Sequence, residues 1–342
     1  MGLPRRLLPL LAAGLAAAGA GAGLAFAHGR VAPIGSGVVV IDTNLGYQDG
    51  RAAGTGMVLT SSGEILTNNH VIDGATAIRV VVPGTGRSFA AWAVGYDIDA
   101  DVAVLQLRGA SNLATVALGD DSTLSVGEAV TALGNAGGAG SLSSASGTVT
   151  GLGKSITASD DEGGAERLTG LVETNAAIEP GDSGGPLLDG AGRVVGMDTA
   201  ASTGGGYGFR TEAAADAYAI PIGKATSIAK RIEAGKASAT IHVGGTAFLG
   251  VEVESTGSYG YGAAPAAGGL IAGVVPGGPA DTAGLVPGDV ITAIAGRTVS
   301  SPTAITTLLL TKKPGTRIAV RYLDETGVTQ VATVKLGSGP PR

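Results

Sequence analysis

The stretch Gly181-Asp182-Ser183-Gly184-Gly185-Pro186 is the most informative part of this sequence of 342 residues. A serine hydroxyl becomes a nucleophile only when a base takes its proton and a site stabilises the oxyanion that forms. Glycines on both sides of Ser183 allow a tight turn that aims backbone N–H groups at one point. We therefore predict that Ser183 is a nucleophile and that the amides of Gly181 and Ser183 form an oxyanion hole. The alternative is an ordinary turn, because turns commonly use Gly, Asp and Ser.

The base that activates Ser183 is predicted to lie upstream of it. The same glycine–serine pattern occurs in α/β-hydrolases, but there the nucleophile precedes both the acid and the histidine, and a helix follows it. After Ser183 there is one histidine, His242, and residues 186–189 have the pattern of a strand and a turn. Upstream, His28 borders the N-terminal apolar run, whereas His70 ends a strand-like run. His70 is therefore the predicted general base, with a structural histidine as the alternative.

The third member of such a triad is a shielded carboxylate that orients the imidazole. Asp101 begins the apolar run 102–107 and is predicted to be buried, whereas Asp97 and Asp99 are predicted to lie in a turn. These alternating aspartates resemble a calcium loop, but Val102 stands where that loop needs glycine. We therefore predict no metal site. The lack of cysteine also excludes thiol nucleophiles and cysteine-ligated zinc.

Composition indicates a turn-rich, β-dominated globular protein. The chain has 60 glycines and 15 prolines, and it is 44% hydrophobic and 15% charged. These values exclude a disordered chain and a protein of long helices. The formal net charge is -6, and the basic region that is typical of nucleic-acid binding does not occur.

The hydrophobic pattern divides the chain into two domains. Short runs rich in Val and Ile alternate with turn residues up to about residue 222, which predicts the strands of a sandwich or barrel. Helical spacing then predicts a closing helix over residues 222–234, and Ser301 and Pro302 are predicted to begin a second helix. The predicted units are a first domain over 35–235, a linker over 236–246, a second domain over 247–336 and a tail over 337–342.

Residues 1–27 are predicted to export the chain. Arg5 and Arg6 precede an apolar run that ends in Ala25-Phe26-Ala27, a pattern of small residues typical of a signal-peptide cleavage site. An uncleaved membrane anchor is the alternative, because the run is long enough to span a bilayer. Both readings place the rest of the chain outside the cytoplasm, secreted or in the cell envelope. Contact with the membrane is expected only if this segment stays uncleaved.

With His70, Asp101 and Ser183 in this order, the sequence resembles the HtrA-type (DegP-like) serine proteases of the trypsin-like fold. The resemblance is nearest to secreted actinobacterial members with one C-terminal PDZ domain, and it covers about residues 35–336. It implies a mostly β protein, in which two six-stranded β-barrels are followed by a small α+β PDZ domain. The motifs that carry it are Thr67-Asn68-Asn69-His70-Val71, Asp101-Val102-Ala103-Val104-Leu105 and residues 174–186.

The resemblance implies an exported serine endopeptidase that uses no cofactor and hydrolyses unfolded or misfolded envelope or extracellular proteins. Ser183 would attack the peptide carbonyl, His70 would transfer protons, and Asp101 would orient His70. Ala177 stands where trypsins carry the acid that binds Arg or Lys, so a small or medium apolar residue is expected before the scissile bond. The other predicted substrate-pocket residues are Thr199, Ala200 and Ala219.

Phe248-Leu249-Gly250-Val251 and residues 279–291 resemble parts of a PDZ domain of this group. Such domains bind the C-termini of peptides by β-augmentation, in which the peptide pairs with an exposed strand edge. The resemblance implies that residues 248–251 hold the peptide carboxylate. Ile305 and Leu308 would then supply an apolar pocket for its last side chain.

Three points stay open in the sequence. Many HtrA-type proteins have Asn where Glu179 and Asp182 stand here, and a buried Asp182 without a partner would be destabilising. Relatives often form trimers through N-terminal aromatic residues, which residues 28–36 lack, so the existence of a homo-oligomer is left undecided. The alternative function is a non-catalytic PDZ chaperone or adaptor of the cell envelope.

Overall fold

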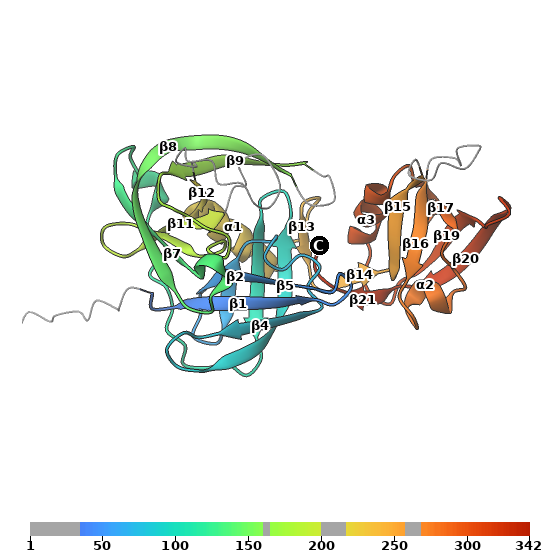
Figure 1. Cartoon of the computed structure of the whole chain (residues 1–342), viewed down its shortest axis with the longest axis horizontal. Helices are drawn as coiled ribbons and strands as arrows, with labels where there is room; N and C mark the ends of the chain where they lie inside the picture. Colours follow the sequence, from blue (N-terminus) through green and yellow to red (C-terminus); the bar gives the residue numbers. More distant parts are fainter. Residues whose placement is uncertain (1–34, 160–164, 200–216, 257–267) are drawn as a thin grey trace, which may run out of the picture. The chain divides into compact units, whose positions relative to one another are not determined.

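The structure is a computed structural model that describes residues 35–159, 165–199, 217–256 and 268–342 (Figure 1). The predicted leader, residues 1–27, lies outside these ranges. Among the residues that are described, no helix has the length and apolar character needed to cross a membrane.

The first sheet contains seven strands in the order β13-β5-β4-β1-β2-β3-β6, and β5 also pairs with β6. Residues Val38, Val39, Val40 and Ile41 of β1 are all buried, because β1 is an interior strand between β4 and β2. The strands are β1 (Val38–Leu45), β2 (Gly50–Val58), β3 (Glu64–Thr67), β4 (Ala77–Val81), β5 (Ser88–Asp97), β6 (Val102–Leu107) and β13 (Ile241–Val243).

The second sheet is a closed barrel of six strands in the order β10-β11-β12-β9-β8-β7. All its pairings are antiparallel, and the long strands β8 and β9 form a ribbon at one side of it (Figure 1). The strands are β7 (Ala129–Gly134), β8 (Ser143–Ser159), β9 (Ala165–Thr174), β10 (Pro186–Leu188), β11 (Val194–Thr199) and β12 (Ala217–Pro221). Two short 3-10 helices, η1 (Asp121–Thr123) and η2 (Ala136–Gly138), flank β7 in the sequence.

Helix α1 (Ile222–Glu233) confirms the predicted closing helix. Its apolar side chains recur at helical spacing and are all buried, which is the pattern of a helix that packs one face against a core. They share a core cluster with Val102 and Val104 of the first sheet and Met197 and Ile220 of the barrel. The buried residues of α1 are Ile222, Ala225, Ile228, Ala229 and Ile232.

The C-terminal domain is an antiparallel sheet in the order β15-β16-β17-β19-β20, with β18 paired to β17. Figure 1 shows α3 beside β15 and β16, which it contacts. The side chain of Ser301 accepts a hydrogen bond from the Ala304 N–H at 3.3 Å, so the predicted helix start is confirmed. The elements are β15 (Val251–Ser255), β16 (Gly269–Val274), α2 (Pro279–Thr282), β17 (Val290–Ile294), β18 (Arg297–Thr298), α3 (Pro302–Leu310), β19 (Arg317–Leu323) and β20 (Thr329–Lys335).

The mostly β fold is as predicted, but two short strands lie where a linker and a tail were expected. Strand β13 lies within residues 236–246 and extends the first sheet by pairing with β5. Strand β21 (Gly337–Gly339) lies within the expected tail and pairs with β14 (Thr246–Phe248). One predicted six-stranded barrel is the closed barrel, and in the first sheet the pairing of β5 with β6 joins the path β5-β4-β1-β2-β3-β6 into a ring, which β13 extends by a seventh strand. Backbone pairing needs no particular side chains. Both strands lie in polar, glycine-bearing segments without a strand-like pattern, so the sequence did not predict them.

Two carboxylates meet where the end of α1 packs near the start of β3. Burial raises the pKa of Glu64 to about 7, and the charge of Glu233 and a hydrogen bond with its side chain add to the shift. Like charges at short range disfavour ionisation of both groups. Glu64 therefore keeps its proton well above the pH at which an exposed glutamate loses it.

This arrangement predicts that the protein becomes less stable as pH rises from about 4.5 to about 7. The folded state binds the Glu64 proton more tightly than the unfolded state, so this stabilisation is complete at low pH and is lost across that interval. Glu64→Gln should melt a few degrees above the wild type at alkaline pH and close to it at acidic pH. Thermal unfolding at several pH values measures this, and equal differences at all pH values would contradict it.

Candidate active site

Ser183 lies on the loop between β9 and β10, and this loop is shaped for glycine. Gly181 and Gly184 have φ angles of 101° and 84°, in the left-handed region that other residues rarely adopt. A Cβ atom on Gly181 would collide with the carbonyl of Asn135, and one on Gly184 would collide with the carbonyl of Thr55. The glycines around Ser183 therefore serve close backbone packing as well as the turn itself.

Thr55 of β2 anchors this loop with two hydrogen bonds. Its N–H donates to the Ser183 carbonyl at 2.9 Å, and its hydroxyl donates to the Gly181 carbonyl at 2.7 Å. The same hydroxyl accepts the Asn135 N–H at 2.9 Å. The hydroxyl of Thr67, on β3, in turn donates to the Thr55 carbonyl at 2.7 Å. The nucleophile loop of the barrel is thus fastened to the first sheet, close to the end of β3 that leads to His70.

His70 and Asp101 form the hydrogen-bonded pair that the sequence predicts. Nδ1 of His70 lies 2.9 Å from Oδ2 of Asp101 and 3.1 Å from Oδ1. The backbone N–H of His70 also donates to Oδ1 at 3.0 Å. With Nδ1–H donated to the carboxylate, Nε2 is the nitrogen that can take a proton. The imidazole is therefore held in the tautomer that a general base requires.

Asp101 is 3% exposed and is held by both halves of the first domain. The Thr199 hydroxyl, from β11 of the barrel, donates to Oδ2 at 3.0 Å, and the Asn68 side chain donates to the Asp101 carbonyl at 2.9 Å. The φ angle of Asp101 is 54°, a strained conformation that persists only where the surroundings impose it. Sequence reasoning missed the roles of Thr55, Asn68 and Asn135. The one available signal was that Asn68 lies within a motif that carries the resemblance.

The predicted substrate-pocket residues have different surroundings. Ala177 is exposed on the nucleophile loop, whereas Ala219 is fully buried in the barrel core with Ala176 and Leu187. Thr199 bonds to Asp101, and Ala200 lies outside the described residues. The assignment of all four to a pocket stays a prediction, as does the oxyanion hole at Gly181 and Ser183.

The predicted peptide site of the C-terminal domain contains an edge strand. Among the described residues, β15 pairs on one side only, with β16, and Gly250 just before it has a φ of 79°. The carbonyl of Leu249 accepts the Ala280 N–H at 2.9 Å, which fixes the turn formed by Phe248, Leu249 and Gly250. Ile305 and Leu308 of α3 are buried in the domain core, with the partly buried Val251 and Val253 of β15 beside them. An edge strand flanked by a helix is the geometry that β-augmentation needs.

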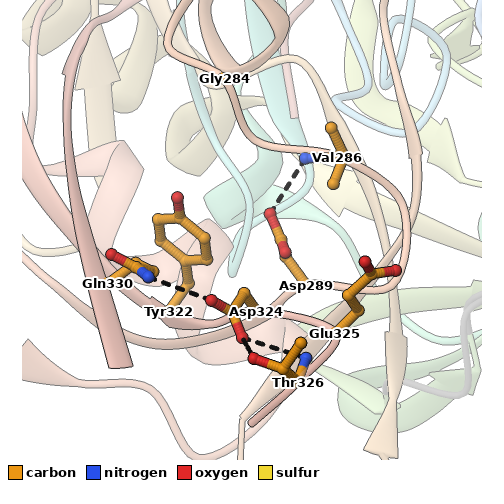
Figure 2. Close-up of a pocket in the computed structure, with 8 residues that line it drawn as sticks. All are labelled: Gly284, Val286, Asp289, Tyr322, Asp324, Glu325, Thr326 and Gln330. Carbon is orange, nitrogen blue, oxygen red and sulfur yellow. Dashed lines mark hydrogen bonds between the residues drawn. The ribbon is translucent and has the colours of Figure 1, made fainter. Parts of the chain in front are cut away.

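A separate cavity of about 260 Å³ lies in the same domain (Figure 2). Asp324 accepts hydrogen bonds from the N–H and hydroxyl of Thr326 and from Gln330, and Asp289 accepts the Val286 N–H. Asp324 and Asp289 therefore stabilise the local turns through these bonds. No group of three or more metal-ligating side chains occurs among the residues described. The lining residues are Gly284, Val286, Asp289, Tyr322, Asp324, Glu325, Thr326 and Gln330.

Comparison with known families separates the same two parts of the chain. Residues 54–197 match the trypsin-like peptidase domain, and residues 270–322 match the PDZ domain. The HtrA-type protease AlgW with tripeptide is a solved structure with a TM-score of 0.50 and 29% identity. The match covers 91% of this chain and 97% of that one.

Curated relatives have similar identities in distant bacteria. A probable periplasmic serine protease (do/HhoA-like) of Haemophilus influenzae is 35% identical over 80% of this chain and 56% of its own length. Serine protease PepD of Mycobacterium tuberculosis is 32% identical over 88% of this chain and 63% of its own length. These identities do not single out the actinobacterial relative, and the chain spans less than two thirds of either protein. With its trypsin-like peptidase domain, its PDZ domain and these relatives, the chain is similar to the HtrA-type (DegP-like) serine proteases.

Proposed function

We propose that this chain is a serine endopeptidase that hydrolyses peptide bonds in proteins. The observation that carries the proposal is the Asp101–His70 pair beside a nucleophile loop fastened to the same sheet by Thr55. Ser183 attacks the peptide carbonyl while His70 takes its proton, and an acyl-enzyme forms as the amine leaves with a proton from His70. Water then repeats the sequence and releases the acid product. Asp101 keeps the imidazole in place and stabilises its charged form.

The substrates are proposed to be unfolded or misfolded proteins outside the cytoplasm. Support comes from residues 1–27, which have the pattern of a leader. Further support comes from a relative in Haemophilus influenzae that is named a probable periplasmic serine protease. Ala177 on the nucleophile loop favours a small or medium apolar residue before the scissile bond, because it cannot pair with Arg or Lys. A non-catalytic adaptor is the weaker proposal, since it leaves the His70–Asp101 geometry without a use.

Ser183→Ala should lower kcat by about 10³-fold or more, because the nucleophile is lost while binding is retained. Cleavage of unfolded casein and labelling by a fluorophosphonate probe measure this on the full chain. The wild type should label and Ser183→Ala should not. Equal labelling of the two proteins, or none of either, would remove the basis for the peptidase.

Thr199→Val should lower kcat by about 10-fold or more with little change in KM. The valine removes a buried hydrogen bond to a carboxylate, and bonds to charged groups are worth about 1.5–3 kcal/mol. Thr199→Ser keeps the hydroxyl and is the matched control, which should retain most of the activity. If the change lies in KM instead, Thr199 acts in the substrate pocket and not through Asp101.

We further propose that the PDZ domain binds the C-termini of peptides along β15. A labelled peptide with an apolar last residue and a free carboxylate should bind Ser183→Ala full chain at least 10-fold more tightly than its C-terminal amide. The difference arises because backbone N–H groups in the turn before β15 would hold the carboxylate. Fluorescence anisotropy measures both affinities, and equal affinities would contradict carboxylate recognition.

A further inference from the structure

Two buried acids, Asp182 and Asp198, are joined by backbone hydrogen bonds to the glycines that follow Ser183 and have no role in the mechanism above. Asp198 on β11 is 0% exposed and Asp182 is 4% exposed. Both carboxylate oxygens of Asp198 and Oδ1 of Asp182 are buried without a hydrogen-bond partner. The other oxygen of Asp182 accepts the Glu179 N–H at 2.9 Å. Buried polar atoms rarely stay unsatisfied, so these three oxygens need an explanation.

The backbone holds these two residues on either side of the glycines that follow Ser183. The Gly184 N–H donates to the Asp198 carbonyl at 2.9 Å, and the Asp198 N–H donates to the Gly185 carbonyl at 2.8 Å. The Gly185 N–H in turn donates to the Asp182 carbonyl at 2.8 Å. A Cβ atom on Gly134 would lie 2.6 Å from Oδ1 of Asp182, so β7 closes over this side chain. The backbones of Asp182 and Asp198 are therefore tied to the nucleophile loop.

The charges near the pair cannot neutralise it. Burial raises the pKa of Asp198 well above its usual range, the charge of Asp182 raises it further, and the backbone N–H of Leu133 opposes these two effects only in part. Burial also raises the pKa of Asp182, and the charge of Glu179 adds to the shift. Strand β7 carries no titratable residue, and the adjoining residue of β11, Thr199, leads to Asp101 and His70 of the triad.

The nearby amide of Asn135 does not supply the missing donor. Its Oδ1 accepts the Gly140 N–H at 2.7 Å, which fixes the orientation of the amide, and its Nδ2 is itself buried without a partner. Two carboxylates in one buried site cannot both ionise, and one proton shared between them is the usual solution. A proton on Asp198 turns one acceptor into a donor and can satisfy Oδ1 of Asp182.

We propose that Asp182 and Asp198 share one proton and that the Asp198 hydroxyl donates it in a hydrogen bond to Oδ1 of Asp182. The pair is a positioning device, because it holds Asp182 and thereby the backbone amides of Gly181 and Ser183. When the pH rises and the proton is lost to solvent, two like charges remain in the same buried site. Their repulsion displaces the loop, so kcat falls on the alkaline side while KM changes little. The activity part of this inference rests on the proposed peptidase function.

The proposal is tested with Asp198→Asn, which keeps an N–H donor at this position but cannot titrate. The matched control is Asp189→Asn in the β10–β11 hairpin, where the carboxylate already pairs with Arg193 at 2.8 Å. We expect kcat of the wild type and of Asp189→Asn to fall at least 10-fold toward alkaline pH, with one apparent pKa that belongs to the pair. Asp198→Asn should keep its kcat at those pH values. If kcat of Asp198→Asn falls at the same pH as that of the wild type, the positioning role is overturned.

A second variant and a readout without activity keep the proton itself testable. Asp198→Ala removes the donor and should lower kcat by about 10²-fold at every pH, as loss of an oxyanion-hole contact does, with thermal unfolding as the check of folding. Infrared spectroscopy at neutral pH is made in the Glu64→Gln background, because Glu64 itself keeps a proton up to about pH 7. There, Ser183→Ala should show the C=O stretch of a neutral carboxyl group, and Ser183→Ala/Asp198→Asn should lack it. An unchanged spectrum overturns proton sharing. If Asp198→Asn removes the carboxyl band but the wild type has no peptidase activity, the proposed function is overturned and proton sharing is not.

Discussion

The carboxylate of Asp101 is the point on which the rest of the site depends. It follows β5 in the first sheet and is buried, so it must be satisfied where it lies, and its partners come from two sheets. His70 supplies two donors from the first sheet, and Thr199 supplies a hydroxyl from the barrel. Displacing the barrel from the first sheet would break this set of bonds. The orientation of the imidazole is therefore a consequence of how the two sheets pack.

The nucleophile loop is positioned by the same principle, with backbone groups in place of a carboxylate. Thr55 holds the carbonyls of Gly181 and Ser183 from the first sheet. From the other side, β11 holds the backbone after the nucleophile through Asp198. Such close approach leaves no room for side chains, which explains the glycines, and little room for water. The acids Asp182 and Asp198 are buried beside this loop, and a shared proton is the way in which we propose that their charge is balanced.

Much of the fold and of the triad could be predicted because the signals are local. Strand-like runs, the helix of residues 222–233 and the cap at Ser301 depend on neighbours in the sequence, and the structure contains each of them. The strands β13 and β21 could not be predicted, since their pairing depends on which strand edge lies nearby. Thr199 was assigned to a pocket, and its bond to Asp101 joins residues whose positions differ by 98. The contact of Asp198 with the nucleophile loop was not predicted, because the sequence around an aspartate in a strand does not show which residues lie next to it in the fold.

The sequence by itself determined which residues are proposed to carry the chemistry of this protein. They are a serine between glycines, a histidine and an aspartate at strand ends, and a PDZ-like turn at the start of the second domain. Residue type and short spacing carry that information, because they set which groups can donate, accept or bend. Only the tertiary structure decided which residues support that chemistry. Thr55, Thr199 and Asp198 meet the site from separate strands. Burial and hydrogen-bond satisfaction, which decide their roles, exist only after those strands have packed together.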